Sequence, residues 1–196
     1  SSGFTLIEML ITVAIVTIMA TLGVPGVRDF FDKEELLGAT EQLYSHLQLA
    51  RIESIKRSVP VYVSFSASGS PWDYGFSHRN ACEPTQSDPL AANACVLVVD
   101  NGNGLVDTGD GFTYSADLML MRFSNTQHAG ISASVEDGSL ELRFDPVRGT
   151  ASSTVLNKKK EIDLVSAQGR QLRLLVGPLG KIHICTPDGS MGNYRD

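Results

Sequence analysis

The segment SSGFTLIEMLITVAIVTIMATLGVPGVRD (residues 1–29) is the part of the sequence that most strongly indicates the fold of the chain. Nineteen uncharged residues follow one another from Met9 to Val27, and one acid, Glu8, stands directly before them. About 20 apolar residues are enough for a helix to cross a bilayer, so this run predicts a membrane-spanning helix. A carboxylate in such a helix costs about 2.5–3.5 kcal/mol on insertion scales, which indicates that Glu8 has a partner.

Three interpretations of this stretch differ in how they treat Glu8. A cleaved secretory signal has an apolar core of only about 7–15 residues with a small-residue cleavage site after it, and this run is longer and lacks that site. An ordinary signal anchor explains the length of the run but not the acid. In the third interpretation, the segment GFTLIE (residues 3–8) resembles the cleavage motif of type IV pilins.

The resemblance to type IV pilins implies a processing site and an assembly contact. A prepilin peptidase would cut between Gly3 and Phe4, residues 1–3 would be the remnant of a leader, and Phe4 would become an N-methylated terminus. In pilins, the acid at the position of Glu8 is thought to meet the terminal amine of a neighbouring subunit. An apolar medium strengthens this attraction and penalises either ion alone, so the pair would set the register between helices.

The helix is expected to continue beyond the apolar run and to change character. Residues 4–27 are expected to form the transmembrane and assembly helix, with a kink at Pro25, which also matches a proline common in type IV pilins. Residues 28–57 predict an amphipathic helix, because the positions of its apolar stripe recur at spacings of three and four. These positions are Leu36, Thr40, Leu43, Leu47 and Ala50. The helix is expected to end before Pro60.

Residues 58–196 predict a β-rich globular domain, in which turn signals separate short segments of alternating or β-branched residues. The predicted strands are residues 60–65, 96–99, 118–123, 131–135, 140–144, 161–165, 170–176 and 181–185. Residues 66–94 are expected to form an irregular surface loop. Trp72 and Tyr74 are expected in a small satellite core, and the alternative is that they anchor a partner. One long helix followed by many short strands predicts an α+β fold, with the helix packed on antiparallel sheet as in type IV pilins.

The three cysteines, Cys82, Cys95 and Cys185, leave the redox state open. In an exported domain, Cys82 and Cys95 are the natural disulfide pair, and closing their loop is worth roughly 3 kcal/mol. Cys185 is then a single thiol, or it replaces one member of the pair. Three reduced and buried cysteines would instead fit a cytosolic location.

Two further segments narrow the resemblance to one group of pilin-like proteins. LYSHLQLARIESIKRSVPVYVSF (residues 43–65) resembles the helix-to-strand core of the FimT/FimU and H-type pseudopilin group. LLVGPLGKIHIC (residues 174–185) resembles the closing strand of that group. The resemblance implies a minor pilin or a pseudopilin.

The stretch VVDNGNGLVDTGDG (residues 98–111) is similar to a calcium-binding loop, in which oxygen ligands alternate around a glycine bend. The candidate ligands are Asn101, Asn103, Asp107 and Asp110. The alternative is a polar β-hairpin in which Asn-Gly supplies the positive φ of the turn. No other cofactor is expected.

Charge is unevenly distributed along the chain, whose formal net charge of −6 argues against a generally nucleic-acid-binding surface. Residues 66–145 hold three Lys or Arg against eleven Asp or Glu, a net charge of −8, whereas residues 146–185 hold seven against two, a net charge of +5. Lys158, Lys159 and Lys160 are most often only a solvated turn. The alternative is that they form a basic face together with Arg170, Arg173, Lys181 and His183. Some FimT-like proteins bind DNA through a basic, glycine-led motif, which makes Lys181 and His183 candidate DNA contacts.

The sequence holds no signature of an active site. The four histidines have no carboxylate or cysteine at ligand spacing, and no G-x-S-x-G nucleophile motif is present. The resemblance to type IV pilins, together with the bulky irregular middle of the β-domain, implies a non-enzymatic minor pilin, a tip or assembly-priming subunit of a type IV pilus. The alternatives are an H-type pseudopilin of a type II secretion system and a DNA-binding minor pilin for natural transformation.

The resemblance also implies partners and a location. The expected partners are other minor and major pilins, the prepilin peptidase, the inner-membrane assembly platform and, before assembly, membrane lipid. The subunit would wait in the inner membrane as a single-pass protein with its domain in the periplasm, and would reach the cell-surface pilus on assembly.

Overall fold

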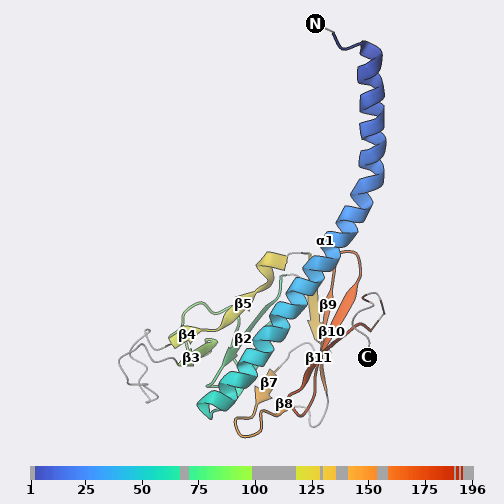
Figure 1. Cartoon of the computed structure of the whole chain (residues 1–196). Helices are drawn as coiled ribbons and strands as arrows, with labels where there is room; N and C mark the ends of the chain where they lie inside the picture. Colours follow the sequence, from blue (N-terminus) through green and yellow to red (C-terminus); the bar gives the residue numbers. More distant parts are fainter. Residues whose placement is uncertain are drawn as a thin grey trace.

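The computed structural model describes residues 3–66, 71–98, 118–128, 130–135, 141–153, 159–187, 189 and 191, and for residues 22–26 and 153 the backbone alone. One long helix, α1 (Leu6–Arg57), has a first half that projects from the molecule and a second half that lies across β-sheets (Figure 1). The strands that pair in the described residues are all antiparallel. The predicted α+β class, with a long N-terminal helix packed on antiparallel sheet, is confirmed.

Both ends of α1 have hydrogen-bonded caps. Thr5 precedes the helix with an extended backbone, and its hydroxyl accepts a hydrogen bond from the backbone N–H of Glu8 at 3.4 Å. At the other end, Ser58 has a left-handed backbone (φ 56°) and donates its N–H to the carbonyl of Ile55 at 3.2 Å. The helix therefore ends before Pro60, as predicted.

The helix passes without interruption through the stretch that contains Pro25. Its axis changes direction between the projecting half and the half that lies on the sheets (Figure 1). A proline inside a helix removes one backbone hydrogen bond and crowds the preceding turn, which accounts for a bend in this region. The predicted kink is therefore present without a break in the helix.

Two sheets form most of the β-domain. The larger has the strand order β5-β2-β1-β7-β8, the smaller has the order β11-β10-β9-β6, and a separate ribbon pairs β3 with β4. The first strands are β1 (Val61–Ser66), β2 (Asp73–Ser77), β3 (Val96–Val98), β4 (Leu118–Leu120), β5 (Arg122–Ser124) and β6 (Ser132–Val135). The later ones are β7 (Glu141–Phe144), β8 (Ala151–Ser153), β9 (Lys160–Val165), β10 (Gln171–Val176) and β11 (Ile182–Cys185). A short 3-10 helix, η2 (Asn125–His128), follows β5.

The apolar stripe of α1 joins the two sheets into one core. All five predicted members of the stripe are buried, so that prediction is confirmed. The same core contains Val61 and Phe144 from the larger sheet and Leu172 from the smaller sheet. Since each turn of the helix from Leu36 to Ala50 contributes a buried side chain, the second half of α1 is an integral part of the domain.

One strand lies in the stretch that the sequence predicts as an irregular loop. β2 pairs with β1 over its whole length, so the loop prediction for residues 66–94 is wrong at this point. Trp72, Tyr74 and Phe76 occupy alternate positions and are all buried in the main core, not in a satellite core. The indole N–H of Trp72 donates to the carbonyl of Ile131 at 3.2 Å. Alternating aromatic residues are a strand signal, and here the neighbouring turn residues hide it.

The single strand predicted over residues 118–123 is divided at Met121. The N–H of Met121 donates to the carbonyl of Cys95 at 2.7 Å, and its own carbonyl accepts from the N–H of Phe76 at 3.0 Å. β4 therefore pairs with β3 in the ribbon, whereas β5 pairs with β2 in the larger sheet. The chain changes partners at Met121, which explains the division. The short strand β8 is also absent from the predicted set.

A disulfide fastens the β3–β4 ribbon to the rest of the domain. Cys82 and Cys95 are bonded with a Cα–Cα distance of 5.0 Å, so the predicted pair is confirmed. Arg57, the last residue of α1, also donates a hydrogen bond from Nη1 to the carbonyl of Val98. Cys185 lies buried in β11, apart from this disulfide.

Candidate functional site

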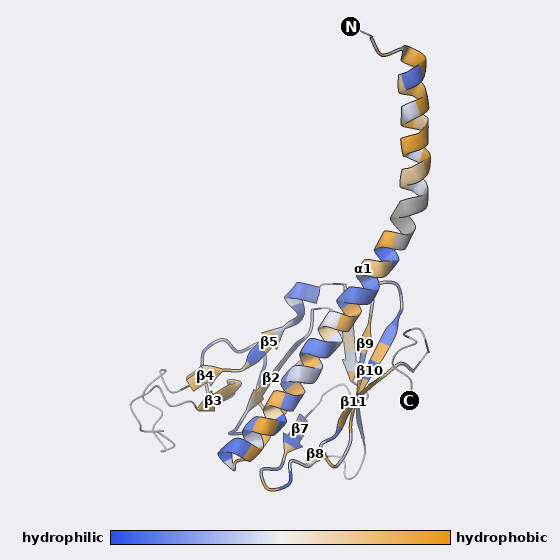
Figure 2. Ribbon diagram, viewed as in Figure 1, coloured by the Kyte–Doolittle hydropathy of each residue, from blue (hydrophilic) through white to orange (hydrophobic). Residues whose placement is uncertain are grey.

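Residues 4–21 of the chain form what we term the projecting segment, which carries apolar side chains on all sides. Figure 2 shows this end of α1 mostly in hydrophobic colours. The exposed apolar side chains are Phe4, Leu6, Ile7, Met9, Leu10, Ile11, Val13, Ile15, Val16, Ile18 and Met19. A protein in water rarely leaves so large and continuous an apolar patch uncovered. The projecting segment therefore indicates contact with an apolar partner.

The residues predicted for processing and assembly lie together at the tip of the projecting segment. Gly3 and Phe4 precede the helix and are exposed, and Glu8 is exposed in its first turn. An acid in this position is favoured by the positive end of the helix dipole. Both a terminal amine on Phe4 and the carboxylate of Glu8 would be accessible to a neighbouring molecule. Cleavage after Gly3 and the pairing of Glu8 stay predictions.

The membrane-spanning prediction for residues 4–27 is a separate question. Across the described part of the chain, we find no helix that has both the length and the apolarity required to traverse a bilayer. The predicted span is therefore not confirmed.

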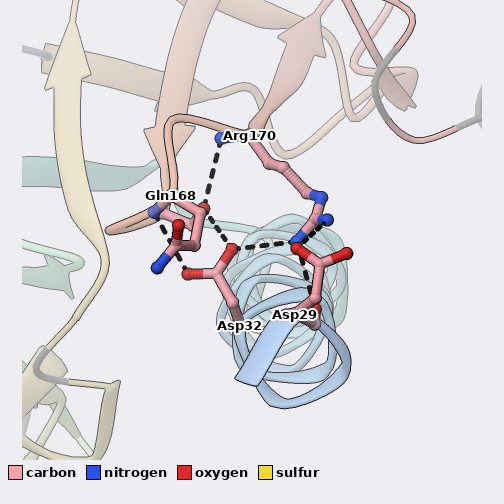
Figure 3. Close-up of polar contacts among 5 residues, drawn as sticks. Asp29, Asp32, Gln168 and Arg170 are labelled. Atoms are coloured by element: carbon pink, nitrogen blue, oxygen red, sulfur yellow. Dashed lines mark hydrogen bonds and ion pairs between the residues drawn. The ribbon is translucent and has the colours of Figure 1, made fainter. Parts of the chain in front are cut away.

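A cluster of polar contacts fixes the place where α1 leaves the domain (Figure 3). Arg170, at the turn between β9 and β10, donates Nη2 to Oδ1 of Asp29 at 2.6 Å and Nη1 to Oδ2 of Asp32 at 3.2 Å. The hydroxyl of Ser166 donates to Asp32 at 2.6 Å, and the backbone N–H of Gln168 donates to Asp32 at 3.3 Å. We term these five residues the turn clamp. It holds the β9–β10 turn against α1 just after the bend in the helix.

The turn clamp is a feature that the sequence does not reveal. Its partners lie 134 to 141 residues apart, and neither the aspartates nor the arginine has a local motif around it. The hydrogen bond to Asp29, together with the charges of both aspartates, raises the pKa of Arg170. Its guanidinium therefore stays charged, and the clamp can hold over any physiological pH.

Replacing Arg170 with alanine is expected to lower the free energy of unfolding by about 1–2 kcal/mol, because Asp32 loses a charged partner at a largely buried site. The amides of residues 28–33 are expected to exchange faster with deuterium, since the turn no longer holds the helix there. Arg173→Ala is the matched control, because the ion pairs of Arg173 join it to the acids of β9 and not to Asp29 or Asp32. Equal local exchange in the two variants would argue against the clamp.

The basic face predicted near the C-terminus is smaller in the structure. Arg170 belongs to the turn clamp, and Arg173 pairs with Glu161 at 2.6 Å and with Asp163 at 2.5 Å. Lys181 and His183 do lie together, on the lining of a pocket of about 190 Å³ at the β10–β11 turn. Lys181 and His183, the two candidate DNA contacts, therefore lie together. Arg170 and Arg173 are instead paired with carboxylates, so they do not add free positive charge to this face.

The four candidate calcium ligands, Asn101, Asn103, Asp107 and Asp110, lie outside the described residues. Within the part of the chain that is described, no group of three or more histidine, cysteine or acidic residues is arranged to hold a metal ion. Calcium binding in residues 98–111 stays a prediction.

One histidine on α1 contacts the aromatic side of the core. Nδ1 of His46 lies 2.7 Å from the hydroxyl of Tyr74, and its ring stacks on Phe123 at 3.8 Å between centroids. Burial lowers the pKa of His46 below its ordinary value of 6.5 and raises the pKa of Tyr74. Burial disfavours the charged imidazole, so it favours the neutral form of His46.

The free energy of unfolding is expected to fall as the pH drops below about 6.5. Burial also lowers the pKa of His78, so in both histidines the unfolded chain binds protons that the folded chain does not. The stabilisation is fully present above pH 6.5 and is lost as the pH falls through the lower pKa of the folded state. Urea unfolding at pH 7.5 and 5.5 measures the loss, and His46→Gln should reduce it. A variant with the same pH dependence as the wild type would rule out His46.

Two parts of the chain match known families or motifs. Residues 39–180 match the family described as Type II transport protein GspH, and residues 1–24 match the motif described as Prokaryotic N-terminal methylation motif. The family match covers the buried half of α1 and most of the β-domain, whereas the motif match covers the projecting segment.

Two proteins with similar sequences are named as a pilin and a fimbrial protein. The Type IV major alpha-pilin of Moraxella bovis is 25% identical over 116 residues, which are 59% of this chain and 72% of that pilin. A Fimbrial protein of Pseudomonas aeruginosa is 30% identical over 105 residues, which are 54% of this chain and 64% of that protein. The crystal structure of the type IV minor pilin FimU of Pseudomonas aeruginosa aligns with a TM-score of 0.46 and 16% identity, over 79% of this chain and 91% of that one.

Proposed function

Because this chain belongs to the GspH family of type II transport proteins and carries the prokaryotic N-terminal methylation motif, we propose that it is a minor pilin, a tip or assembly-priming subunit of a type IV pilus. The resemblance to pilin-like minor pilins and pseudopilins is confirmed by these two matches. One observation carries the proposal: the first half of α1 exposes apolar side chains on all sides, and the second half of the same helix is packed in the core of the β-domain. Proteins of this kind are structural, so the proposed role is not catalytic.

The proposed assembly step joins the tip of one helix to another subunit. Removal of residues 1–3 by a prepilin peptidase would leave an ammonium group on Phe4, four residues before Glu8. In a filament, the carboxylate of Glu8 would pair with the Phe4 ammonium of a neighbour while the projecting segments cover one another. The apolar side chains supply the area of contact, and the ion pair would fix the register. Support for this step comes from the exposure of both residues at the tip.

The proposed location of the protein follows from the projecting segment. Before assembly, an exposed apolar helix needs an apolar environment, which lipid of the inner membrane would provide. The β-domain with its Cys82–Cys95 disulfide suits an oxidising compartment such as the periplasm. The proposed partners are other minor and major pilins, the peptidase and the inner-membrane assembly platform.

A second candidate function is favoured by the name of the matched family. A GspH-type chain would serve as an H-type pseudopilin in a type II secretion system, with the same helix and the same assembly contact. A deletion strain separates the two candidates. Loss of surface pili and twitching would support the pilus subunit, whereas loss of secreted enzymes with normal pili would support the pseudopilin.

Replacing Glu8 with alanine is expected to reduce incorporation into filaments by about tenfold or more, since an ion left unpaired in an apolar contact costs roughly 3–5 kcal/mol. The measurement is the amount of subunit in sheared filaments relative to the amount in membranes. Glu34→Ala is the matched control, because Glu34 is an exposed acid on the same helix outside the projecting segment. Wild-type incorporation of the Glu8 variant would contradict the proposed assembly step.

A further inference from the structure

A second surface with exposed apolar residues lies at the end of the domain away from the projecting segment. Nε of Arg51 donates to the carbonyl of Gly149 at 2.9 Å, and the N–H of Ala151 donates to the carbonyl of Pro178 at 3.0 Å. The 145–150 turn and the 177–181 turn therefore meet the last turns of α1. The helix between residues 29 and 51 separates this place from the turn clamp by about 33 Å, at a rise of 1.5 Å per residue. We term it the distal surface.

Each of the three segments that meet at the distal surface exposes a large apolar side chain. Val147 is 84% exposed, Leu179 is 77% exposed and Ile55 is 47% exposed. The pocket of about 190 Å³ at the β10–β11 turn is lined by Leu175, Pro178 and Leu179, and Lys159, Lys181 and His183 border it. Small-molecule sites usually measure roughly 300–1,000 Å³. This pocket therefore suits a single apolar side chain of a larger partner.

The positive charges of the distal surface have no acidic partners within the described residues. No carboxylate there lies within 4.0 Å of the charged groups of Lys159, Lys181 or Arg148. Elsewhere in the domain, Arg170 and Arg173 each pair with two carboxylates. Unmatched cations around an apolar pocket are complementary to an acidic partner that offers an apolar side chain.

Two other anionic partners fit this surface less well. Lipid headgroups are disfavoured, because the distal surface lies at the opposite end of the domain from the projecting segment. Nucleic acid is disfavoured, because Leu175 of the pocket lies opposite Glu161, and the two carboxylates of Glu161 and Asp163 share the single positive charge of Arg173. An extended polyanion would therefore meet a net negative charge beside the pocket, whereas a short acidic segment need not reach it.

We infer that the distal surface is a docking site for an acidic protein segment, which places one apolar side chain in the pocket and carboxylates against Lys159 and Lys181. The inference rests on the proposed function in one respect, since it assigns that segment to a neighbouring subunit of the same filament. The projecting segment and the distal surface would then contact different neighbours, one through buried helices and one through the β-domain.

The test uses the ¹⁵N-labelled full chain in neutral detergent micelles and a capped pentapeptide with phenylalanine between two pairs of acidic residues. We expect saturable chemical-shift changes at the amides of residues 175–183, weakening as salt is added. A peptide with the acids replaced by their amides should bind about fivefold more weakly or worse, as should a peptide with alanine for phenylalanine. Equal binding of all three peptides, or no shifts at residues 175–183, would overturn the inference.

Two charge-reversal variants test whether the peptide binds at the pocket. Lys181→Glu is expected to weaken peptide binding by about tenfold, whereas Lys56→Glu, at a 70% exposed lysine on α1, should change it less than about twofold. Unchanged shifts elsewhere would show that Lys181→Glu still folds. Tighter binding of phosphatidylglycerol vesicles or duplex DNA at the same amides would also overturn the inference. None of these outcomes affects filament incorporation through Glu8, so a failure here is distinguishable from a failure of the proposed function.

Discussion

Gly180→Ala will lower the free energy of unfolding of the domain by roughly 2–5 kcal/mol, the largest effect expected from adding a single methyl group. A Cβ atom at this position would lie 1.9 Å from the carbonyl oxygen of Gly149, a distance at which the backbone must move. The backbone of Gly180 is also left-handed (φ 72°), which disfavours any residue with a side chain. Urea unfolding of the full chain in micelles measures the loss.

Gly169→Ala separates the two causes of this loss. Gly169 also has a positive φ, 80°, but a Cβ atom there would meet nothing within 4 Å. Its variant should therefore lose only the conformational part, about 1–2 kcal/mol. If both alanine variants lost the same stability, the close approach of the 145–150 and 177–181 turns would have no measurable role.

Leu43→Ala will lower the free energy of unfolding by about 2–5 kcal/mol, because it leaves a cavity between α1 and both sheets. Leu43 is fully buried in the stripe that joins the helix to the domain. The weakened contact should also increase hydrogen exchange along residues 36–50. Since that stripe fixes the projecting segment to the domain, less intact subunit is expected in filaments.

Ile52→Ala is the matched control on the same helix. Ile52 is 56% exposed, so its truncation should change stability by no more than about 0.5 kcal/mol. A comparable loss in the two variants would mean that the helix is held by something other than the buried stripe.

The features that the sequence predicts well are those with local causes. The stripe of α1 follows from helical spacing, and the C-terminal end of the helix follows from Pro60. Most strands were expected within a residue or two, because alternating apolar positions mark a strand with one buried face. At the candidate site, the sequence locates Gly3, Phe4 and Glu8 through a motif of six residues.

The features that the sequence does not predict depend on distant contacts. β2 was expected as part of a loop because turn residues surround the alternating Trp72, Tyr74 and Phe76. The division at Met121 depends on Cys95 and Phe76, which come from other strands. The turn clamp and the distal surface join α1 to segments that follow it by 141 and 98 residues, and no local pattern indicates such pairs.

The uninterrupted course of α1 has a mechanical consequence. A pull on the projecting segment would load the backbone of one continuous helix, and the first attachments to bear that tension would be the side chains of Asp29 and Asp32 on Arg170. Behind them, the buried stripe would be sheared along its length, so the load would spread over several helical turns before reaching any single strand. If the proposed filament forms, we therefore expect its subunits to bear traction along this shared contact before any single strand is pulled from its sheet.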